Sequence, residues 1–151
     1  MKIIVDDLRG PEIARFLQAH LDHMREITPE GSVYALDLDA LRAPEVTFWT
    51  VLDGDEVIGC GALKRLDGTE GEIKSMRSHP DRRRTGIGAL VLEHILAEAK
   101  NMGLSRLSLE TGATDFFLAP RSLYAKYGFE PCGPFGDYDH DPHSAYMTKA
   151  L

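Results

Sequence analysis

The sequence has little cysteine, no long apolar run and no excess of positive charge, and each shortage excludes a class of protein. Cys60 and Cys132 are the only cysteines among 151 residues, so a disulfide framework or a cysteine-rich zinc site is excluded. No apolar run approaches the roughly 20 residues that a membrane-spanning helix needs. The formal net charge of −7 disfavours a nucleic-acid-binding role.

The first residues lack the pattern of a secretory signal. Met1 to Val5 is followed at once by Asp6 and Asp7, whereas a signal peptide would continue as an apolar segment. We therefore expect a cytoplasmic protein that contacts no membrane. The length of 151 residues and the hydrophobic content of 43% predict a single globular domain over residues 1–151.

The residue pattern predicts an α+β fold. Strands are expected at residues 1–5, 46–52, 56–63, 70–78, 105–110, 129–132 and 145–148, and helices at residues 11–25, 36–41, 88–102 and 120–127. Asp53-Gly54 marks a hairpin turn in the first half, whereas strands and helices alternate in the second half. Hairpins followed by a strand–helix–strand crossover predict a mixed, mostly antiparallel central sheet flanked by helices.

The segment Arg83-Arg84-Thr85-Gly86-Ile87-Gly88 is the most informative part of the chain. It joins a predicted strand to a predicted helix, where free backbone N–H groups and the positive end of the helix dipole favour a phosphate or pyrophosphate. The two glycines let a large anion approach the backbone, and Arg82 to Arg84 add positive charge. Taken alone, the same residues would equally suit an arginine-rich helix start on the surface.

Three kinds of anion-binding loop compete for this segment. A Walker A loop needs Gly-Lys-Ser/Thr, which is not present here, and a dinucleotide fingerprint needs a small residue where Val91 stands. Arg83-x-x-Gly86-x-Gly88 resembles instead the Arg/Gln-x-x-Gly-x-Gly/Ala loop of the GCN5-related N-acetyltransferases (GNATs). Tyr124-x-x-x-Gly128-Phe129 resembles the end of a later helix in that family. The resemblance covers roughly residues 45 to 150.

The resemblance implies the GNAT fold and the direct transfer of an acetyl group from acetyl-CoA to a primary amine, without a metal. Two parallel strands would splay apart at the level of Met76 to Ser78, and the pantetheine arm would lie between them, bound to the backbone of Met76, Arg77 and Ser78. An N–H near Met76 would polarise the thioester carbonyl. The pyrophosphate would meet the loop formed by Arg83, Arg84, Thr85, Gly86, Ile87 and Gly88.

The resemblance also implies catalytic roles for two side chains. Tyr124 would assist the departing thiolate, and Glu72 would remove a proton from the amine, with Glu110 as the alternative base. Without the resemblance, Tyr124 would be an ordinary core aromatic and Glu72 a solvated or salt-bridged glutamate beside Lys74. Phe117 stands where many family members have an asparagine that bonds the cofactor, so no polar contact is expected there.

The acceptor is the least specified part of the function. In this fold the first helices and a late loop surround the acceptor pocket, which makes Tyr34, Asp37, Tyr138 and His140 candidates for binding a small-molecule or peptide amine. Two other hypotheses stay open at this point: a non-catalytic acyl-CoA-binding or regulatory module, and a different nucleotide-binding enzyme. Sheet edges in so small a domain would also permit a homodimer.

Overall fold

The computed structural model describes residues 1–27 and 38–151, and a seven-stranded sheet runs through them. The strands are β1 (Lys2–Val5), β2 (Val46–Asp53), β3 (Glu56–Arg65), β4 (Glu70–Ser78), β5 (Arg106–Gly112), β6 (Glu130–Cys132) and β7 (Ser144–Ala150). Their order in the sheet is β1-β2-β3-β4-β5-β7-β6. β4 and β5 pair in parallel, whereas the other neighbours are antiparallel, which confirms the predicted mixed sheet.

The helices agree closely with the prediction. They are α1 (Pro11–Ile27), α2 (Leu38–Leu41), α3 (Ile87–Asn101) and α4 (Leu118–Lys126), with 3-10 turns at Pro80–Arg82 and Asp115–Phe117. α4 begins two residues earlier than predicted because the second 3-10 turn leads directly into it. Pro120 is tolerated there because the first turn of a helix does not need its backbone N–H for a helical hydrogen bond.

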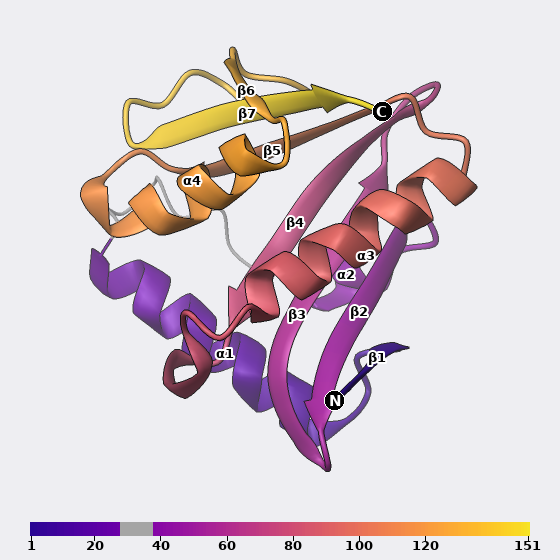
Figure 1. Cartoon of the computed structure of the whole chain (residues 1–151), viewed down its shortest axis with the longest axis vertical. Coiled ribbons are helices and arrows are strands. Elements are labelled where there is room, and N and C mark those ends of the chain that lie inside the picture. The colour runs from indigo at the N-terminus through magenta and orange to yellow at the C-terminus, as the bar shows by residue number, and fades with distance from the viewer. Residues whose placement is uncertain (28–37) are drawn as a thin grey trace.

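Helices cover both faces of the sheet. Figure 1 shows α3 crossing one face, with α1 and α2 on the other side. Under α3, Val91, Leu92 and Ile95 are buried in one apolar cluster that includes residues of β2 to β5. Under α1, Ile13 and Leu17 belong to a second cluster, in which the sheet contributes Phe48, Val57, Cys60 and Ala62.

The parallel pair at the centre of the sheet separates before its strands end. The register of β4 with β5 runs from Glu70–Arg106 to Ile73–Leu109, although β4 continues to Ser78 and β5 to Gly112. A positive φ of 55° at Ser75 and a register shift between β3 and β4 mark a β-bulge at the point of separation. Figure 1 shows the two strands diverging towards their carboxyl ends, as the family resemblance implied.

Among the described residues, no helix combines the length and the apolar composition that crossing a bilayer requires.

Gly61 of β3 allows α3 to lie close to the sheet. A Cβ atom at this position would be 2.6 Å from Cγ1 of Val91 and 2.9 Å from Cδ1 of Ile95. Because such distances lie well inside van der Waals contact, we expect Gly61→Ala to lower the free energy of unfolding by about 1–3 kcal/mol. Urea denaturation followed by circular dichroism would measure the change.

Gly133→Ala is the matched control for this substitution. A Cβ at Gly133 would have no atom of the described residues within 4 Å, and the residue does not have a positive φ. The control should change the free energy of unfolding by no more than about 0.5 kcal/mol. Equal effects of the two substitutions would contradict the packing argument.

Candidate active site

The diverging strands open a cleft of about 940 Å³, called the central cleft below. One wall is the edge of β4 from Glu72 to Ser78, and the facing wall contains Glu110, Thr111 and Gly112 at the end of β5. The start of α3 and residues of α4 line one end, whereas residues of α1 and α2 line another. The cleft is therefore bounded by segments that lie far apart in the sequence.

Most of the residues predicted for the site line this cleft. They are Glu72, Met76, Arg77, Ser78, Arg83, Arg84, Gly86, Ile87, Gly88, Glu110, Tyr124 and Tyr138. Two predicted residues do not: His140 is exposed on its loop, and the hydroxyl of exposed Thr85 donates a hydrogen bond to the Arg82 carbonyl. Tyr34 and Asp37 lie outside the described residues.

The amino end of α3 presents backbone N–H groups to the cleft. Gly86 occupies the N-cap position with a φ of 88° and a ψ of 7°, and no side chain of the described residues caps the helix. The first turn of α3 holds no acidic residue, and Arg84, which precedes the helix, has a φ of 64°. Because the first N–H groups of a helix have no intrahelical partner and carry partial positive charge, this end is suited to an anion.

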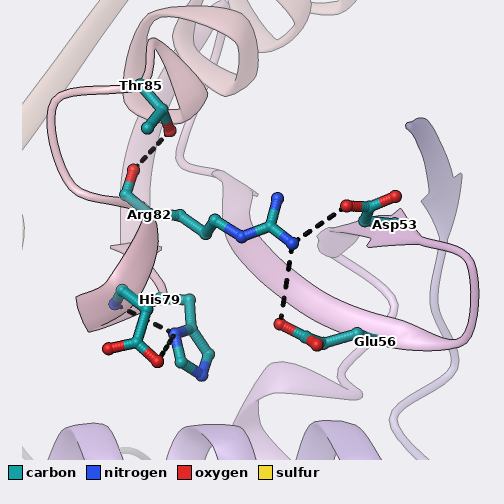
Figure 2. A network of polar contacts seen from close by, with 6 residues as sticks. Asp53, Glu56, His79, Arg82 and Thr85 are labelled. Carbon is teal, nitrogen blue, oxygen red and sulfur yellow. Dashed lines mark hydrogen bonds and ion pairs between the residues drawn. The ribbon is translucent and has the colours of Figure 1, made fainter.

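Arg82 does not contribute its charge to this anion site, contrary to the expectation from sequence. Figure 2 shows its guanidinium turned towards the hairpin between β2 and β3, where Nη2 lies 2.9 Å from Asp53 Oδ2 and 4.0 Å from Glu56 Oε1. Arg82 therefore ties the loop to the hairpin. Arg83 and Arg84 do line the cleft, and the Arg83 guanidinium lies 5.7 Å from the ring centroid of Phe116, within range of a cation–π interaction.

Two carboxylates face the cleft where β4 and β5 separate. Glu72 is only 4% exposed, and its Oε2 accepts a hydrogen bond from the Tyr138 hydroxyl at 2.7 Å. Nζ of Lys74 lies 3.7 Å from the same oxygen. Tyr138, a residue predicted for the acceptor pocket, therefore contacts the glutamate that the sequence suggested as a base.

Glu110 on β5 is the second carboxylate. Burial raises its pKa to about 7, the nearby charge of Glu72 adds to the increase, and a hydrogen bond with Ser144 opposes it. In the parallel register Glu72 lies opposite Ser108, which places Glu110 two residues further along the neighbouring strand. A carboxyl group with a pKa near 7 can take up and release a proton at neutral pH.

Tyr124 is a buried phenol in the wall of the cleft. Its ring packs edge-on against Phe129, with 5.8 Å between the ring centroids. Burial raises the pKa of its hydroxyl far above the ordinary value, and the charge of Glu110 raises it further. Tyr124 therefore stays protonated at neutral pH, so its hydroxyl can act as a hydrogen-bond donor inside the cleft.

Tertiary structure adds residues that the sequence analysis did not select. The α1 and α2 side of the cleft contains His20, Leu21, Met24 and Leu41, and the adjoining strands contribute Val46 and Lys64. Neither spacing nor motif marks these side chains, because they meet only when the helices pack on the sheet. Within residues 1–27 and 38–151, no group of three or more His, Cys, Asp or Glu side chains is placed to hold a metal ion.

Comparisons with known proteins agree with this geometry. Residues 13–129 match the acetyltransferase (GNAT) family. The chain is 48% identical over 151 residues to the uncharacterized N-acetyltransferase YsnE of Bacillus subtilis (strain 168), covering 100% of both chains. It is 46% identical over 149 residues to the uncharacterized N-acetyltransferase YedL of Escherichia coli (strain K12), covering 99% and 94%.

A solved structure gives the same result for the fold. The GNAT family acetyltransferase from Elizabethkingia anophelis, with acetyl-CoA bound, superposes on this chain with a TM-score of 0.73 at 21% sequence identity. The match covers 99% of this chain and 97% of the other.

Proposed function

Since this chain belongs to the acetyltransferase (GNAT) family and is an N-acetyltransferase, we propose that it moves the acetyl group of acetyl-CoA directly to a primary amine bound in the central cleft. One observation carries the proposal: an uncapped helix start and a pair of diverging parallel strands line the same cleft. The first provides an anion site, and the second provides unpaired backbone along β4. Both are needed to hold an elongated substrate with a pyrophosphate in its middle.

The residues of this chain suit the two polar regions of acetyl-CoA. We place the pyrophosphate at the amino end of α3, within reach of the backbone of Gly86, Ile87 and Gly88 and of the cationic side chains of Arg83 and Arg84. We place the pantetheine arm along Met76 to Ser78, beyond the point at which β4 stops pairing with β5. A backbone N–H near Met76 would polarise the thioester carbonyl.

We assign the proton-accepting role to Glu110 rather than to Glu72. Glu72 already accepts a hydrogen bond from Tyr138 and lies beside Lys74, which suits a fixed negative charge that attracts the ammonium form of the amine. Glu110 faces the same space with a pKa of about 7. It can therefore take a proton from the bound ammonium and leave the neutral amine that reacts.

The transfer then follows from proximity. The neutral amine nitrogen forms a bond to the thioester carbon, and the carbon–sulfur bond breaks as its electron pair goes to sulfur. The nitrogen loses a second proton as the amide forms, and this proton balances the one that the CoA thiolate takes up. The protonated Tyr124 hydroxyl supplies a hydrogen bond or a proton to the departing thiolate. Holding both substrates in one cleft contributes much of the rate acceleration, because the step no longer depends on a bimolecular encounter.

Gly86→Glu tests the cofactor site. It would place a carboxylate at the uncapped amino end of α3, where it competes with the pyrophosphate for the same N–H groups. We expect the Kd for acetyl-CoA to rise by about tenfold or more, or ~1.4 kcal/mol, while the protein stays folded. Isothermal titration calorimetry with acetyl-CoA would measure the Kd, and circular dichroism would monitor the fold.

Gly103→Glu provides the control, because Gly103 follows the other end of α3. Its φ of 80° is similar to the 88° of Gly86, and at both glycines an added Cβ would have no atom of residues 1–27 or 38–151 within 4 Å. The two variants therefore share the backbone strain and the change of charge. An equal loss of affinity in both would show that strain, and not the anion site, causes the effect.

Glu110→Gln tests the base. Because the reaction needs the ionised carboxylate, kcat/KM of the wild type should rise as pH increases through about 7, the pKa of Glu110. The variant should lose activity by about a hundredfold and should lose this limb of the pH profile. Exposed Glu130→Gln should leave both unchanged. A profile that keeps its limb in Glu110→Gln would assign the base elsewhere.

Tyr124→Phe tests the donor to the thiolate. Removal of the hydroxyl should lower kcat by about tenfold or more with little change in the Kd for acetyl-CoA. Tyr127→Phe is the control, because Tyr127 lies three residues further along the chain and its hydroxyl bonds the side chain of Glu93 away from the cleft. Single-turnover kinetics would separate the chemical step from product release, and equal rates in both variants would contradict the role.

A further inference from the structure

Arg77 brings an uncompensated positive charge to the central cleft. It follows the bulge in β4 and is half-buried, and the groups that influence its pKa include Cys60 on the α1 face of the sheet. Burial lowers the pKa of its guanidinium, and the positive charge of Arg83 lowers it further. In the part of the chain that the structure describes, no carboxylate pairs with Arg77 and no side-chain hydrogen bond satisfies it.

His20 of α1 lies in the same part of the cleft. Its Nδ1 atom is buried and has no hydrogen-bond partner among residues 1–27 and 38–151, and the same is true of the buried hydroxyl of Ser75 at the bulge. Burial, followed by the charges of Arg77 and His23, lowers the pKa of His20 to about 4, so its ring is neutral at pH 7. Buried polar groups in native proteins almost always have partners, so these atoms point to a ligand that supplies them.

The two lysines of the cleft are placed differently from Arg77. Lys74 lies 3.7 Å from Glu72, and Lys64 is opposite Glu72 in the register of β3 with β4. These two lysines flank a carboxylate, whereas Arg77 does not. The cleft therefore has two carboxylates, Glu72 and Glu110, where β4 and β5 separate. Further along β4 it has the Arg77 guanidinium beside the neutral polar groups of His20 and Ser75.

We propose that the acceptor is an amino acid, whose carboxylate binds Arg77 and His20 while its amine faces Glu72 and Glu110. The proposal deepens the function proposed above and depends on it. A guanidinium presents two parallel N–H groups that match a carboxylate, and the neutral imidazole adds one hydrogen bond. We place Arg83 and Arg84 on the pyrophosphate, so Arg77 is left with one positive charge, which matches a monoanion such as a carboxylate.

The distance between amine and carboxylate is set by the length of β4 between the two groups. Continuing the parallel register one residue beyond Ile73–Leu109 brings Glu110 level with Lys74, three residues before Arg77, which corresponds to about 10 Å along a regular strand. The long side chains of Glu110 and Arg77 span part of this distance. The test therefore needs amino acids of increasing length and not α-amino acids alone.

The experiment compares acceptors that differ only in the carboxylate. Glycine, β-alanine, 4-aminobutyrate and 6-aminohexanoate would each be paired with the amide of the same compound, and release of CoA from acetyl-CoA would be followed with a thiol reagent. For at least one pair we expect the wild type to favour the carboxylate by tenfold or more in kcat/KM. Arg77→Gln should abolish that preference by raising KM, whereas Arg77→Lys should retain part of it.

Two further measurements distinguish this role from a structural or cofactor-binding one. The Kd for acetyl-CoA should be the same in the wild type and Arg77→Gln, because we place the cofactor on the backbone of this residue and not on its side chain. Arg9→Gln is the matched control, since the Arg9 side chain is 78% exposed and pairs with neighbouring Asp7. It should keep the full preference for carboxylates.

Each contrary result would overturn one specific part of these proposals. Equal rates for the carboxylates and their amides, or no reaction of any carboxylate while acetyl-CoA binds, would overturn the acceptor proposal alone. A weaker affinity of Arg77→Gln for acetyl-CoA with an unchanged preference would reassign Arg77 to the cofactor. Failure of the wild type to bind acetyl-CoA would overturn the proposed function itself, and the acceptor proposal with it.

Discussion

The site depends on one constraint, which is that β4 and β5 stop pairing at Ile73 and Leu109 while both strands continue. Parallel strands that paired to their ends would close the space between them with a ladder of hydrogen bonds. The bulge at Ser75 prevents this, because its positive φ turns β4 away from its neighbour. The energetic cost of an unusual backbone conformation and of lost hydrogen bonds is thus concentrated where a substrate can make the missing contacts.

The same bulge separates two kinds of chemistry along β4. Before it, Glu72 and Lys74 form a charged pair in a polar cluster with Tyr138. After it, the side chain of Met76 packs with the apolar cluster under α3, whereas Arg77 neighbours Cys60 and His20 on the α1 side. A uniform strand would simply alternate between core and solvent. Here the bulge changes the register, so that exposed backbone, the carboxylate of Glu72 and the guanidinium of Arg77 all border one cleft.

Much of this fold could be predicted from the sequence because local rules determine it. The turn at Asp53-Gly54, the glycine after α3 and the glycine-rich loop before it each require particular backbone angles, and the strands and helices between them follow the expected periodicities. The separation of β4 from β5 has no comparable local signal. It was expected only from the family resemblance, because it depends on pairing partners that lie more than 30 residues apart.

The electrostatics of the site could not be predicted for a related reason. Arg82, Arg83 and Arg84 are equivalent in the sequence, yet Arg82 is neutralised by the β2–β3 hairpin while the other two line the cleft. Glu72 and Glu110 are likewise two glutamates on strands, and only packing decides which one is held by Tyr138 and which one titrates near pH 7.

A charged group in this fold is available to bind a substrate when the fold places no partner beside it. The fold provides partners for Arg82, Lys74 and Glu72, and these groups are consequently fixed in place. Within the described part of the chain, it provides no side-chain partner for Arg77, for His20 Nδ1 or for the N–H groups at the start of α3. Because isolated buried polar groups are unfavourable, their concentration in a single cleft is the strongest physical indication of what binds there. An acetyl donor with a central pyrophosphate and an acceptor that joins an amine to a carboxylate would together supply the missing partners.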